Sequence, residues 1–160
     1  MDALMISPAK TVHILAGKSL AGLFFSLLAA IVMFVFTASW IVHWEVAVLA
    51  VLLGGLSTVS LGLLIGSISD NPTTVNLWAG LAIIVLIIPV FLWTSILPKL
   101  SFQAKTLLRV LPSVAMSNLI NISFTEKYLF REVIINSLIL AMFVIIILSL
   151  VSWRFRRMDR

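Results

Sequence analysis

The longest charge-free run of the sequence is NPTTVNLWAGLAIIVLIIPVFLWTSILP, residues 71–98. Fourteen leucine, isoleucine, valine and phenylalanine residues lie between positions 75 and 98. A helix needs roughly 20 apolar residues to cross about 30 Å of hydrocarbon, so this run is long enough to span a bilayer. Asn71 followed by Pro72 predicts the start of the helix at residue 72, because asparagine caps free amides and proline loses no hydrogen bond at the first helical position.

Three similar runs lie at residues 19–42, 46–69 and 133–153. The chain is 62% hydrophobic and 11% charged, whereas soluble domains carry roughly a quarter charged residues. The sequence therefore predicts an all-α integral membrane protein with about four transmembrane helices, and it excludes a soluble globular domain. The short connections at 43–45 and 69–71 predict that consecutive spans are antiparallel neighbours.

The segment 99–132 is expected to remain on one side of the membrane. Pro112 separates two helical patterns, of which residues 102–111 predict an amphipathic interfacial helix and residues 113–124 a partly inserted or re-entrant helix. The second pattern has only twelve residues and is too short to cross. Such a segment needs other helices or another subunit close to it.

An even number of spans places both ends of the chain on one side, and the basic tail 154–160 predicts that this side is cytoplasmic. The segment 99–132 would then be extracytoplasmic. The difference in basic residues is small, because that segment carries five and the inner side six. We interpret the net charge of +5 as a signal of topology at a lipid surface and not of nucleic-acid binding.

No constellation for catalysis is present in the sequence. The chain lacks cysteine, and His13 and His43 are separated by the first span without a paired acid, so we expect no catalytic residue and no metal site. No Gly-rich loop for nucleotide phosphates occurs, so we expect no cofactor in this chain. The first three spans contain no ionisable residue, which disfavours an ion-coupled carrier.

Two features of the spans concern helix packing. Small residues spaced four apart form one stripe on the second span: Gly54, Thr58, Gly62 and Gly66. This stripe suits either packing against the first or third span or a dimer seam, and the interpretation favours packing within the chain. Pro89 removes a backbone hydrogen bond in the third span and predicts a kink that could act as a hinge.

The stretch DALMISPAKTVHILAGK, residues 2–18, resembles a segment of ABC-2-type transporter permeases. In that family an acidic residue, an apolar pair, a Ser/Thr-Pro step and a Gly-Lys pair precede a membrane span. The similarity continues in LGLLIGSISD, residues 61–70, and in LPS, residues 111–113. It covers nearly the whole chain in order.

The resemblance implies that residues 1–18 form a cytoplasmic coupling-helix region that docks onto a separate ATP-binding subunit. The residues implied in that contact are Asp2, Leu4, Met5, Ile6, Ser7, Lys10 and Lys18, although anchoring at the membrane surface would explain Lys10 and Lys18 equally well. ATP would be bound by the partner, and two permease subunits, identical or different, would export substrate by alternating access across the plasma membrane.

Members of that family usually have two further spans before the coupling helix. The resemblance therefore implies that this sequence is the C-terminal portion of a permease. The alternative function is a small membrane scaffold or assembly protein without transport activity. An ATP-binding subunit that recognises the N-terminal segment would distinguish the two.

Overall fold

A computed structural model of the chain describes residues 11–68, 71–96 and 102–158. The described residues form helices and connecting turns, with no strand: α1 (Thr11–Thr37), the short 3₁₀ helix η2 (Ala38–Trp40), α2 (Trp44–Ile68), α3 (Pro72–Ile96), α4 (Phe102–Arg109), α5 (Pro112–Ser123) and α6 (Phe130–Met158). Within the described ranges, four helices are long and apolar enough to cross a membrane, with candidate spans at Leu20–Trp40, Trp44–Ile68, Thr73–Ser95 and Phe130–Arg154. The predicted all-α membrane fold is confirmed.

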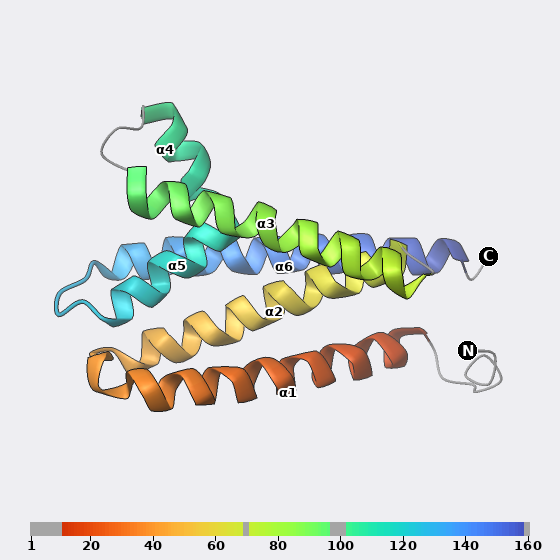
Figure 1. The fold of residues 1–160 in the computed structure, drawn as a ribbon, viewed down its shortest axis with the longest axis horizontal. Helices are drawn as coiled ribbons and strands as arrows, with labels where there is room; N and C mark the ends of the chain where they lie inside the picture. Colours follow the sequence, from red (N-terminus) through yellow and green to blue (C-terminus); the bar gives the residue numbers. More distant parts are fainter. Residues whose placement is uncertain (1–10, 69–70, 97–101, 159–160) are drawn as a thin grey trace.

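The four long helices lie lengthwise beside one another in Figure 1. The start of α1 and the end of α6 lie at one end of the bundle, and α4 and α5 lie at the other, which we call the α5 end. Helix α2 occupies the centre, because it contacts α1, α5 and α6 extensively and α3 to a smaller extent. Helices α5 and α6, which are distant from α2 in the sequence, therefore pack against it more extensively than α3, the span that follows it.

Helix boundaries differ from the predicted spans by a few residues. Helix α2 already begins at Trp44, so the predicted connection 43–45 is displaced toward the N-terminus and Glu45 lies in the first helical turn. A carboxylate is favourable there because the helix N-terminus carries partial positive charge. Helix α6 begins at Phe130, and Glu132 lies in its first turn, where its carboxylate is favoured in the same way.

Local signals in the sequence account for several helix starts. Helix α3 begins at Pro72, and the backbone amide of Thr73 donates to Oδ1 of Asn71 over 3.0 Å. Helix α5 begins at Pro112, and Leu111 before it is extended with φ −73° and ψ 135°. That backbone conformation follows from the clash between a proline ring and a preceding helical residue.

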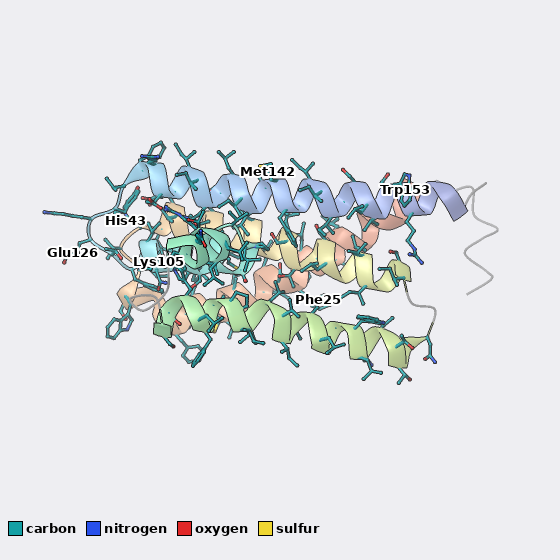
Figure 2. All side chains as sticks on the ribbon, turned by 90° about the horizontal axis from the view of Figure 1, so that it is seen from above. Phe25, His43, Lys105, Glu126, Met142 and Trp153 are labelled. Atoms are coloured by element: carbon teal, nitrogen blue, oxygen red, sulfur yellow. The ribbon has the colours of Figure 1, made fainter. Side chains whose placement is uncertain are left out.

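The buried core lies where α2, α5 and α6 meet. Its members are Val46, Ala50, Ala115, Leu119, Val133 and Leu140. Large apolar side chains elsewhere point away from the protein, and the exposed fraction is 69% for Phe25 and 61% for Met142 (Figure 2). Exposure on this scale suits helices whose solvent is hydrocarbon.

Candidate functional site: helix α5 and the two cavities beside it

Helix α5 is the short helix that the sequence predicts as partly inserted, and it packs among the long helices. Val114, Ala115 and Leu119 are fully buried on its inner face, against α2 and α6. The carbonyl of Ser123 at its end accepts hydrogen bonds from the amides of Val42 (2.9 Å) and His43 (3.0 Å). The loop between α1 and α2 is therefore fixed to the end of α5.

A chain of side-chain hydrogen bonds joins α5 to two long helices. Nε1 of Trp93 on α3 donates to Oδ1 of Asn118 over 2.8 Å. Nδ2 of Asn118 donates to Oδ1 of Asn136 on α6 over 3.3 Å, and Nδ2 of Asn136 donates to the carbonyl of Glu132 over 2.7 Å. Asn136 is completely buried, so its amide depends on these partners for its hydrogen bonds.

Charged and titratable side chains gather at the α5 end, where Figure 2 shows His43, Lys105 and Glu126. Arg109 at the end of α4 donates to the carboxylate of Glu132 on α6. Nδ1 of His43 lies 3.3 Å from a carboxylate oxygen of Glu45, and its ring meets Tyr128 edge-on with 4.5 Å between centroids. These contacts connect α4 to α6 and the loop residues His43 and Tyr128 to each other.

A cavity of about 530 Å³ lies between α5 and α3 and is called the α3-side cavity. Its walls come from four helices: Gly54, Ser57, Thr58 and Leu61 of α2; Leu86, Ile87, Val90, Phe91 and Thr94 of α3; Pro112, Ser113, Met116, Ser117, Ile120 and Asn121 of α5; Leu140 and Phe143 of α6. None of these lining residues is charged.

A second cavity, of about 570 Å³, lies between α1, α2 and α5 and is called the α1-side cavity. Residues of α1, including Ser26 and Met33, form one wall, and residues of α2 and α5 form the others. Met116 and Ile120 of α5 line both cavities. Gly54 and Thr58 of α2 also line both, so the two cavities are adjacent.

The structure places the residues of the predicted small-residue stripe in two environments. Gly54 is buried, and a Cβ atom added there would lie 2.6 Å from Sδ and Cε of Met116, so α5 approaches α2 closely at this point. Thr58 lines both cavities, while a Cβ at Gly62 or Gly66 would meet open space. The atoms nearest to a Cβ at Gly54 thus belong to α5.

The remaining predicted residues divide into two groups. Asp2, Leu4, Met5, Ile6, Ser7 and Lys10 lie outside the described residues, and Lys18 belongs to the first turns of α1. Pro89 lies inside α3, which continues as a helix on both sides of it. Among the described residues, no three or more histidine, aspartate or glutamate side chains come together in a way that could hold a metal ion.

The sequence did not predict two close helix contacts, nor the chain of hydrogen bonds from Trp93 through Asn118 to Asn136. A Cβ at Gly55 would lie 2.7 Å from Oγ of Ser26, and one at Gly22 would lie 2.9 Å from Val59, so α1 and α2 touch at both glycines. The sequence did contain a signal for these hydrogen bonds, since Asn118 and Asn136 carry amide side chains within apolar segments. Polar residues in such segments commonly bond across helices.

Comparison with known proteins gave one family. The model of the family described as ABC-2 family transporter protein matches residues 1–153. Neither the search of curated proteins nor the search of solved structures gave a match.

Proposed function

Because the chain belongs to the ABC-2 transporter family, we propose that it is a permease subunit, or a portion of one, of an ATP-binding cassette exporter that works with a separate ATPase subunit. The observation that carries the proposal is the family match over residues 1–153 of a chain with four apolar, membrane-length helices. A permease is the membrane-spanning component of such a transporter and is not itself catalytic.

The assignment of ATP binding to a separate subunit rests on the sequence of the chain. Its sequence has no phosphate-binding loop of the G-x-x-x-x-G-K-[ST] type. We therefore assign ATP binding to a separate subunit, from which energy would reach these helices by contact. The N-terminal segment 1–18, which resembles a coupling helix, is the part we assign to that contact.

Helix α1 gives this assignment a direct route into the membrane. It runs without interruption from Thr11 to Thr37, so its first turns, residues 11–18, belong to the coupling segment and most of its remainder lies in the first candidate span. A displacement of the segment would be transmitted along one continuous helix. Movement of α1 against α2 would then change the α1-side cavity, which both helices line.

The test is recovery of an ATP-binding subunit with the tagged chain from native membranes. Wild type is compared with Leu4→Asp and Ile6→Asp, which place a charge in the coupling segment. Leu129→Asp is the matched control, because Leu129 is 71% exposed and directly precedes α6 at the α5 end. We expect wild type and the control to recover the ATPase and the other two variants to lose it. If no ATPase accompanies the wild type, the proposal fails and a scaffold protein becomes the better interpretation.

A further inference from the structure

Hydroxyl groups around the α3-side cavity differ in how their hydrogen-bonding capacity is used. Ser57 and Thr58 on α2 donate to carbonyls of their own helix at 2.8 and 3.0 Å, and Thr94 on α3 does the same at 3.0 Å. These three hydroxyls therefore already have acceptors.

Helix α5 contributes a different kind of wall. Ser113, Ser117 and Asn121 all line the cavity, and a spacing of four residues places them along one face of the helix. Oγ of Ser113 is covered yet has no hydrogen-bond partner. In the described part of the chain, the side chains of Ser117 and Asn121 also form no hydrogen bond. A row of unused polar groups about 12 Å long, from eight residues at about 1.5 Å each, thus borders the cavity.

The walls opposite this row are apolar. Helix α3 contributes Leu86, Ile87, Val90 and Phe91, and α6 contributes Phe143. An ionised group would find no opposite charge among the described lining residues, and burying an unpaired charge is strongly unfavourable. A bare hydrocarbon chain would leave the row on α5 without partners, which also costs free energy. Both a charged ligand and a purely apolar one are disfavoured.

We propose that the α3-side cavity binds an uncharged amphiphile that places several hydrogen-bonding groups along α5 and its apolar side against α3 and α6. Its volume of about 530 Å³ falls in the range of roughly 300–1,000 Å³ that holds drug-sized ligands. The inference deepens the proposed function by naming the class of substrate. Oγ of Ser113 is covered, so a hydrogen bond from it to such a ligand requires a change of its χ1 rotamer.

The probe for this test is a monooleoylglycerol that carries a diazirine in its acyl chain. It is added to the full chain in phosphatidylcholine nanodiscs, and cross-linked residues are mapped by mass spectrometry. A sulfate-headed analogue with the same chain and diazirine tests the role of charge. Labelling of the lipid-facing side of α1, for example at Phe25, measures background.

The variants are Ser113→Ala/Ser117→Ala and Asn121→Ala, with Ser60→Ala as the matched control. Ser60 is a buried serine of α2 that is not among the residues lining this cavity, and its hydroxyl bonds to its own helix. We expect cavity labelling by the neutral probe to fall about three- to tenfold in the α5 variants, as expected for one or two lost hydrogen bonds. The control keeps wild-type labelling. Asn121 is exposed, so its variant keeps the test valid if the double variant does not fold.

Three results would overturn the proposal: equal labelling of wild type and the α5 variants, equal or stronger cavity labelling by the sulfate probe, or adducts confined to lipid-facing residues. The experiment contains no ATPase. Its failure therefore leaves the proposed permease role untouched, and failure to recover an ATPase leaves this binding result untouched.

Discussion

Replacing the buried Asn136 by leucine is expected to destabilise the contact between α5 and α6. The substitution keeps the side chain similar in size but removes two hydrogen bonds, from Asn118 at 3.3 Å and to the carbonyl of Glu132 at 2.7 Å. The Glu132 carbonyl lies four residues before position 136, so it keeps its backbone partner in the helix. Nδ2 of Asn118 is left without an acceptor, which costs about 1–3 kcal/mol. We expect Asn136→Leu to lower the free energy of unfolding by about that amount.

A double-mutant cycle separates the bond between the two asparagines from the other effects. Unfolding of wild type, Asn118→Leu, Asn136→Leu and the double variant is followed by circular dichroism as the denaturing detergent SDS is added to mixed micelles. Side-chain bonds between membrane helices average about 0.6 kcal/mol and reach about 1.7 kcal/mol. The 3.3 Å separation is long for a hydrogen bond, so we expect coupling near the average. Additive effects of the two substitutions would refute the bond as a source of stability.

Two further predictions concern helix packing and a surface ion pair. Gly55→Val is expected to weaken the α1–α2 contact by about 1–3 kcal/mol through overpacking. Gly62→Val, at a position where a Cβ meets open space, is expected to leave the free energy of unfolding nearly unchanged in the same SDS titration. Equal losses in both variants would contradict close packing at Gly55. Arg109→Met is expected to change stability by less than about 1 kcal/mol, because the side chains of Arg109 and Glu132 are 40% and 36% exposed and water screens their pair; a loss above about 2 kcal/mol would show that this pair holds α4 in place.

Composition and hydrophobic run length were sufficient to predict the membrane fold. A run such as 71–98 has one stable solution in hydrocarbon, a helix with all its backbone groups bonded internally. Proline gave equally local information, since α3 and α5 both begin at one. Boundaries were less accurate at α2 and α6, because charged residues in a first helical turn look like loop residues in the sequence.

The candidate site could be predicted only in part, because it depends on contacts between distant segments. The sequence predicted that residues 113–124 form a short helix near other helices. It could not show that Asn118 meets Asn136 or that Met116 lies over Gly54, since register between helices is set by packing of whole surfaces. The glycine of α2 that packs against α1 is Gly55, which follows Gly54 directly and is not a member of the predicted stripe.

The position of α5 has a consequence for how space inside this bundle can change. Because Met116 and Ile120 line both cavities, the two compartments share one wall. A change of rotamer at Met116 or Ile120 therefore alters the shape of both compartments at once. A ligand that displaces either side chain in one compartment changes the space that is left in the other.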